Sequence, residues 1–110
     1  MENLKNQHCL NSTTISKLST AEILNYLAEL PNWSIGSDQS SIIAKFEFKN
    51  FKQTMFFINA VAYIAEHECH HPEVKFSFNY CQITLNTHDV AGLSINDFIC
   101  AAKINGLLEK

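Results

Sequence analysis

The stretch FKQTMFFINAVAYIAEHECHHPEVKFSF, residues 51–78, decides the fold, because a helical pattern and an extended pattern meet within it. Its first part carries apolar residues at steps of three and four: Phe51, Met55, Ile58, Ala62 and Ala65. This spacing predicts a long helix with those residues on its buried face. Asn50 followed three positions later by Gln53 is typical of a helix N-terminus, and the helix is expected to end near Cys69.

Pro72 marks the point where helix gives way to extended chain. The residue before a proline is biased away from the α region, so His71 is expected to lie outside the helix. The ring nitrogens of His70 and His71 can then leave the helix surface. Beyond the proline, residues 74–78 alternate between apolar and polar, which predicts a strand.

The same alternation predicts strands elsewhere in the chain. They cover residues 33–35, 42–48 and 81–88. Asn79 and Tyr80 form the expected tight turn before the last of these strands, because asparagine tolerates the left-handed conformation better than most residues. His88 is expected to end that strand on its polar side.

Helices are also predicted near both ends of the chain. Ser19 and Glu22 form a capping box for a first helix, which Pro31 ends. Ser94 and Asp97 cap a last helix. Its predicted apolar stripe consists of Ile95, Phe98, Ile99, Ala102 and Leu108.

The resulting element order is αββαββα, which predicts an α+β fold. We expect a four-stranded antiparallel sheet with three helices packed on one face. Residues 1–18 are predicted to be a polar N-terminal leader, and residues 19–110 a single domain. A chain of 110 residues with 46% hydrophobic content is sufficient for one core.

Charge and composition argue against several classes of protein. A net charge of −3 offers no basic surface to a phosphate backbone, so direct nucleic-acid binding is not expected. We find no apolar run of the length of a signal peptide or membrane span, and therefore expect a cytoplasmic protein without membrane association. The four cysteines form no CxxC pair, and we interpret them as reduced thiols. Their even number would also allow a single disulfide bridge.

The main candidate site is a group of histidines and one carboxylate near the middle of the chain. Glu66 lies one helical turn before His70 and His71, Pro72 follows them, and His88 lies at the expected strand end. Imidazole exchanges protons near neutral pH, and a nearby carboxylate can orient it. The group therefore predicts a proton-transfer site.

The same residues allow two other interpretations. His67, Cys69 and the neighbouring histidines supply zinc-type ligands, but no CxxC or HExxH frames them, so no metal is predicted. Histidines at a helix C-terminus also interact favourably with the helix dipole without any catalytic role. Likewise Glu66 fits a solvated helix residue, Thr87 fits strand preference and Asp97 fits a helix cap.

Taken together, these residues form a pattern that is similar to a known family. The motif comprises AEHECHHPE at residues 65–73, Asn79, ITLNTH at residues 83–88, GLS at residues 92–94, and Asp97. It resembles pterin-4a-carbinolamine dehydratase, also called 4a-hydroxytetrahydrobiopterin dehydratase. The likeness runs from about Ser19 to the C-terminus, and the joint spacing of these residues is highly specific.

The resemblance implies an enzyme that removes water from 4a-hydroxytetrahydropterin to give quinonoid dihydropterin. That reaction recycles the pterin cofactor of aromatic amino acid hydroxylases, so a functional link to such a hydroxylase is implied. The pterin is the substrate, and no metal or organic cofactor is expected. Family members form homodimers or homotetramers through sheet edges and helices, and share the αββαββα fold.

The resemblance also implies roles for particular residues. The catalytic positions are His70, His71 and His88. Supporting or substrate-binding positions are Glu66, Pro72, Thr87 and Asp97. By analogy His70 and His88 are acid/base candidates, and His71 binds and orients the substrate. Glu66 is expected to orient a histidine or raise its basicity.

Two positions depart from the animal members of the family. They usually carry an acidic residue before the histidine pair and an aromatic residue two positions after the proline, where this chain has Cys69 and Val74. Substrate affinity and range are expected to differ as a result.

A second hypothesis is a protein-interaction module, because animal relatives also act as a dimerisation cofactor of a homeodomain transcription factor.

Overall fold

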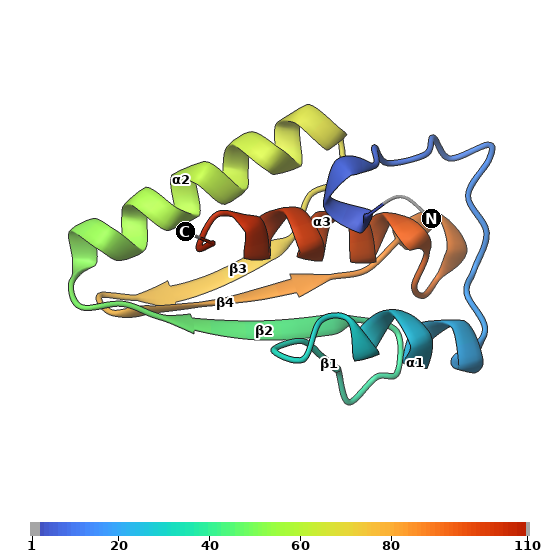
Figure 1. Ribbon diagram of the computed structural model, residues 1–110, viewed down its shortest axis with the longest axis horizontal. Coiled ribbons are helices and arrows are strands. Elements are labelled where there is room, and N and C mark those ends of the chain that lie inside the picture. The colour runs from blue at the N-terminus through green and yellow to red at the C-terminus, as the bar shows by residue number, and fades with distance from the viewer. Residues whose placement is uncertain (1–2, 110) are drawn as a thin grey trace.

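Three α-helices lie on one face of a four-stranded antiparallel sheet in the computed structural model, which describes residues 3–109 (Figure 1). The helices are α1 (Thr20–Ala28), α2 (Phe51–Glu68) and α3 (Ile95–Gly106). The strands are β1 (Ser34–Ile35), β2 (Ile42–Glu47), β3 (Glu73–Ser77) and β4 (Tyr80–Leu85). Two short 3-10 helices, η1 (Leu4–Asn6) and η2 (His88–Val90), complete the described elements. The predicted α+β class and αββαββα order are confirmed.

The sheet order is β1-β2-β4-β3, so β4 lies between two partners. Ile83 at its centre pairs with Ala44 of β2 and Val74 of β3. Cys81, Ile83 and Leu85 are buried and alternate with partly exposed residues, as expected for a strand with one face on the core. The other face of the sheet carries mostly polar side chains, such as Lys45, Gln82 and Thr84.

The core lies between this sheet and the helices, and α3 is its most deeply buried element. Phe98, Ile99 and Ile104 of α3 are almost fully buried, and the Phe98 ring stacks on Tyr26 with centroids 5.1 Å apart. Burying one such side chain stabilises the fold by roughly 1.5–3 kcal/mol. This packing fixes the start of α3, which carries Asp97.

The buried face of α2 differs from the predicted one. Its buried residues are Thr54, Phe57, Val61, Ala65 and Glu68. Of the predicted face, Ala65 is buried and Met55 and Ile58 are partly buried. Phe51 and Ala62 are exposed, so the prediction was wrong for these two residues. The reason is that α2 is apolar on several sides, and tertiary contacts select the buried face. The Thr54 hydroxyl, for example, lies 2.9 Å from the carbonyl oxygens of both Asn50 and Phe78 and shares its one proton between them.

Two other predictions were wrong where the chain turns. The β3–β4 turn consists of Phe78 and Asn79, one residue earlier than expected, since Ser77 pairs with Tyr80. Strand β4 ends at Leu85. His88 therefore begins η2 rather than ending a strand, because the chain bends back through a bridge between residues 87 and 92.

At the C-terminal end, Leu108 lies beyond α3 and is half exposed, so it does not extend the apolar stripe of that helix.

The caps at the N-termini of the three α-helices were predicted correctly. Capping boxes form at Ser19 with Glu22 and at Ser94 with Asp97. Asn50 accepts a hydrogen bond from the backbone of Gln53.

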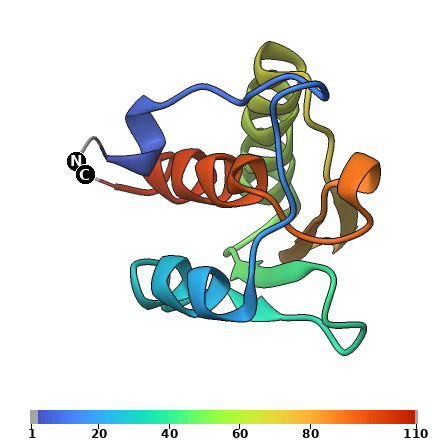
Figure 2. The same cartoon turned by 90° about the vertical axis from the view of Figure 1, so that its right-hand side faces the viewer.

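Residues 3–18 run along one end of the molecule, from η1 beside α3 to the start of α1 (Figures 1 and 2). Leu4 is buried in the core, and Lys5 forms an ion pair with Glu109. In Figure 2 this segment passes in front of α2 and α3 on its way to α1.

Within residues 3–109, the structure has no helix long and apolar enough to cross a membrane.

Candidate active site

The C-terminal end of α2 places His70. Cys69 has left-handed backbone angles (φ 54°, ψ 39°), its N–H bonds the carbonyl of Glu66, and the N–H of His70 bonds the carbonyl of Ala65. These two bonds are those of a Schellman motif, which ends a helix and turns the chain away. His70 is thereby directed off the helix toward α3, as the proline had predicted for this junction.

His70 contacts the carboxylate of Asp97 from α3. Its Nε2 lies 2.7 Å from Asp97 Oδ1; the Asp97 side chain is fully buried, and that of His70 is 12% exposed. The two residues lie 27 positions apart and meet because α3 packs beside the end of α2. A short bond between an imidazole and a buried carboxylate fixes the orientation of the ring.

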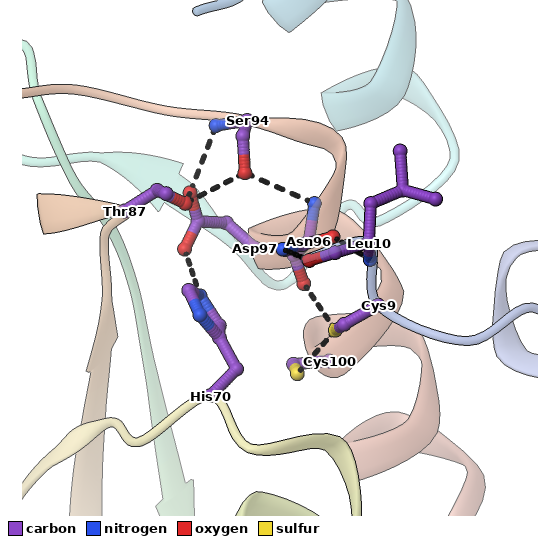
Figure 3. A network of polar contacts seen from close by, with 8 residues as sticks. All are labelled: Cys9, Leu10, His70, Thr87, Ser94, Asn96, Asp97 and Cys100. Atoms are coloured by element: carbon purple, nitrogen blue, oxygen red, sulfur yellow. Dashed lines mark hydrogen bonds and ion pairs between the residues drawn. The ribbon is translucent and has the colours of Figure 1, made fainter. Parts of the chain in front are cut away.

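A hydrogen-bond network holds Asp97 in place (Figure 3). Its Oδ2 accepts from the Thr87 hydroxyl at 2.7 Å and from the backbone N–H of Ser94 at 3.0 Å. The Thr87 hydroxyl uses its one proton on Asp97, so the Ser94 hydroxyl, 2.6 Å away, donates to Thr87. Asp97 therefore combines a helix cap with support of a histidine.

This network determines the tautomer of His70. An ionised carboxylate only accepts hydrogen bonds, so His70 Nε2 carries the proton that it shares with Asp97. In the neutral ring Nδ1 is then the basic nitrogen. Proton uptake at Nδ1 gives an imidazolium whose charge faces the carboxylate, an arrangement suited to a general base.

The other two predicted histidines are exposed. His71 Nε2 lies 3.7 Å from Glu66 Oε1, with side chains 61% and 81% exposed, so solvent weakens this ion pair. His88 is exposed at the start of η2, directly after the buried Thr87. Both rings are free to meet a ligand from the solvent side.

A polar pocket of about 830 Å³ joins these residues. His70, His71, Thr87 and His88 line it. This volume lies in the usual range for small-molecule sites. Asp97 reaches the pocket only through His70 and Thr87.

Besides Asp97, two of the predicted supporting residues do not line this pocket. Glu66 lies beside His71 on the exposed surface of α2. Pro72 is half-buried and borders a small gap in the core together with Ala65 and Leu85. Its contribution is to the junction after α2 rather than to the pocket surface.

The other wall of the pocket was not foreseen from the sequence. It consists of residues from the N-terminal leader: His8, Cys9, Leu10, Asn11, Ser12 and Ile15. The buried Asn96 and Glu68 also border the pocket and bind the leader. The signal in the sequence was the presence of Asn96 and Glu68 within largely apolar helices. When such polar groups are buried, they need hydrogen-bond partners from another segment.

Glu68 is the most perturbed carboxyl of this region. Burial raises its pKa, but hydrogen bonds from the Cys9 N–H and the His8 ring, together with the charge of Lys103, outweigh burial. These contacts hold the pKa of Glu68 below its ordinary value of 4.5. The charged form of Glu68 thus stabilises the attachment of the leader.

All four cysteines are free thiols, and two are buried. Burial raises the pKa of the Cys81 thiol to about 11. A hydrogen bond with Cys9, together with burial, also raises the pKa of the Cys100 thiol. Among residues 3–109, no three His, Cys, Asp or Glu side chains are grouped so as to hold a metal ion.

The fold recurs in solved proteins. A Brucella melitensis protein described as a transcriptional coactivator/pterin dehydratase superposes with a TM-score of 0.81 at 30% identity, over 84% of this chain and 99% of its own. A pterin dehydratase-like RuBisCO assembly factor of the alpha-carboxysome matches with a TM-score of 0.61 at 26% identity, over 69% and 88%. The chain is therefore similar in fold to these two proteins.

Sequence comparison identifies the family. The family model "Pterin 4 alpha carbinolamine dehydratase" matches residues 16–107, and the chain belongs to this family. A relative from Hydrogenovibrio crunogenus is 44% identical over 96% of this chain and 95% of its own length. One from Legionella pneumophila strain Philadelphia 1 has the same identity and coverage. Both are named "Putative pterin-4-alpha-carbinolamine dehydratase".

Proposed function

We propose that this protein is a 4a-hydroxytetrahydrobiopterin dehydratase, a carbon-oxygen hydro-lyase. The observation that carries the proposal is the buried His70–Asp97 pair at a pocket that His71 and His88 also line. Family membership and the names of the relatives support the same activity. The substrate is a pterin 4a-carbinolamine, and the products are quinonoid dihydropterin and water.

The reaction needs an acid and a base in one site. The bond between carbon 4a and its hydroxyl oxygen breaks, and the oxygen takes a proton and leaves as water. The ring cation that remains loses the proton of N5, which gives the quinonoid product and balances the proton used. Imidazole suits both transfers near neutral pH, so no metal or organic cofactor is required.

We assign the base to His70, because Asp97 holds its Nε2–H and stabilises the charge that forms when Nδ1 takes the N5 proton. His88 is the acid that protonates the departing hydroxyl, and its exposed ring exchanges protons with solvent. His71 binds and orients the pterin, with Glu66 beside it. Thr87 supports His70 through Asp97.

The physiological role that we propose is recycling of the pterin that an aromatic amino acid hydroxylase releases as the carbinolamine, in the cytoplasm. The test uses a purified hydroxylase to generate the carbinolamine and follows the quinonoid product by absorbance. The wild-type protein is expected to accelerate dehydration over buffer. A preparation that leaves the rate at the buffer value would refute the proposal.

A second candidate function is self-association or protein binding through the outer face of α2. Phe56 and Tyr63 lie two helical turns apart on this face and are 64% and 70% exposed, so both rings are available to a partner. Two structurally similar proteins are named as a coactivator and an assembly factor. We propose a homodimer or homotetramer that uses this face and the sheet edge.

Light scattering on the wild-type protein and on the double variant Phe56→Glu/Tyr63→Glu tests this assembly. The variant is expected to have a lower mass because two charges would be buried in the interface. Equal masses for variant and wild type would exclude α2 as the interface.

A further inference from the structure

Residues 8–15, here called the N-terminal strap, form one side of the pocket that contains the histidines. Five of these residues line the pocket from His8 to Ser12, and Ile15 does so further along. Figure 2 shows the strap crossing the end of the molecule where α2 ends and α3 begins. The strap lies before residue 16, where the match to the family model starts.

A paired amide holds the strap to α3. The Asn96 side chain accepts from the N–H of Leu10 at 2.8 Å and donates to the carbonyl of the same residue at 2.9 Å (Figure 3). Asn96 is 4% exposed, so both bonds are shielded from water. A buried amide with both functions bound to one backbone residue fixes that segment in position.

A buried carboxylate holds the strap to α2. Glu68 accepts from the N–H of Cys9 at 2.7 Å and bonds the His8 ring at 2.9 Å. The thiol of Cys9 also lies 3.7 Å from the carbonyl of Asn96 and 3.6 Å from the sulfur of Cys100. At its far end the strap is followed by Leu18, whose N–H donates to Leu93.

Between these attachments the strap offers polar groups to the pocket. The Asn11 side-chain oxygen is occupied by bonds from Thr13 and Thr14. Ser12, in contrast, makes no side-chain hydrogen bond to any of the described residues, although it lines the pocket and is exposed. Thr13, the next residue, is exposed but does not line it.

We infer that the N-terminal strap is a substrate-binding wall, in which Ser12 contacts the reduced pterin and Asn96 and Glu68 are positioning residues. This inference rests on the proposed dehydratase function and extends it to a segment outside the matched family model. The three candidate catalytic histidines, His70, His71 and His88, lie outside the strap, so we assign the strap to binding rather than proton transfer. Its loss therefore raises KM more than it lowers kcat.

Ser12→Trp and Ser16→Trp form a matched pair for the first test. Both serines are exposed, so neither substitution disturbs the core. Ser16 follows the strap and does not line the pocket. We expect Ser12→Trp to fill part of the pocket and lower kcat/KM about tenfold or more, a difference of about 1.4 kcal/mol. Ser16→Trp is expected to match the wild type, and equal values for the two variants would overturn the substrate-binding wall.

Asn96→Leu tests the positioning role through two readouts. Without the amide, the strap is expected to detach, and alkylation of Cys9, resolved by peptide mapping, is expected to accelerate at least fivefold. KM for the carbinolamine is then expected to rise about tenfold, with kcat within a factor of about two. The control Glu109→Gln removes the charge from an ion pair of the leader outside the pocket and is expected to change neither readout.

The outcomes separate the two proposals. Fast Cys9 alkylation in Asn96→Leu with an unchanged KM would refute the strap as a binding wall. Unchanged alkylation would refute Asn96 as its anchor. A wild-type protein without dehydratase activity would instead refute the proposed function. If the wild type is active and the strap variants have the same KM and kcat/KM as the wild type, only this inference is refuted.

Discussion

Replacing Asp97 by asparagine tests the role of the buried carboxylate without changing its size. The carboxylate has three hydrogen bonds, to His70 at 2.7 Å, Thr87 at 2.7 Å and the Ser94 N–H at 3.0 Å. The single oxygen of asparagine can keep the Thr87 and Ser94 bonds. Its NH₂ group then faces His70 Nε2 and forces that nitrogen to become the acceptor.

This change places the ring proton of His70 on Nδ1, so the neutral ring loses its basic nitrogen toward the substrate. General base catalysis contributes about 10²–10⁴ in rate, so we expect kcat to fall about a hundredfold, or roughly 2.7 kcal/mol. KM is expected to change little, because Asp97 does not line the pocket. Loss of a charge-assisted bond also destabilises the fold by about 1.5–3 kcal/mol.

The assay is stopped-flow dehydration of the carbinolamine, with circular dichroism to establish that Asp97→Asn is folded. His70→Ala and the double variant His70→Ala/Asp97→Asn complete a cycle. If Asp97 acts through His70, the double variant is no slower than His70→Ala alone. A folded Asp97→Asn variant with wild-type kcat, or additive losses in the cycle, would refute this reasoning.

Further predictions concern the residues around the histidine pair. Cys69→Asn is expected to raise the free energy of unfolding by about 0.5–1 kcal/mol in urea titration, because asparagine tolerates the left-handed angles of Cys69 better; a decrease would contradict this. The pKa of Glu68 is lowered on folding, so the unfolded chain binds more protons, and Glu68 stabilises the fold above pH 4.5. The stability difference between wild type and Glu68→Gln should therefore shrink as the pH falls below that value, and a constant difference would count against it. Glu66→Gln should reduce kcat/KM less than about tenfold, because Glu66 is 81% exposed and lies 3.7 Å from His71. A larger loss would show that Glu66 contributes more to the reaction than a solvent-exposed ion pair can.

Local sequence signals predicted the elements of the fold well. The capping boxes at Ser19 and Ser94 involve residues three positions apart, and the end of α2 near Cys69 follows from Pro72. The buried face of α2 could not be predicted in this way. Phe51 and Phe56 make the helix apolar on several sides, and only packing against the sheet selects one of them.

The candidate site was predictable as a list of residues but not as an arrangement. The motif indicated His70 and Asp97, yet their contact depends on how α3 packs beside α2. The strap was missed because its anchor joins Leu10 to Asn96, 86 positions away, and such a pair leaves no periodic pattern. Long-range pairing of single polar groups is decided by the folded structure.

The double variant His70→Ala/His88→Ala tests the central claim most directly, which is that these histidines catalyse carbinolamine dehydration. The variant should be compared with the wild type at equal concentration, with binding of a stable dihydropterin measured on both. We predict that dehydration falls to near the buffer rate while the dihydropterin still binds. Wild-type turnover in the folded double variant would contradict the account.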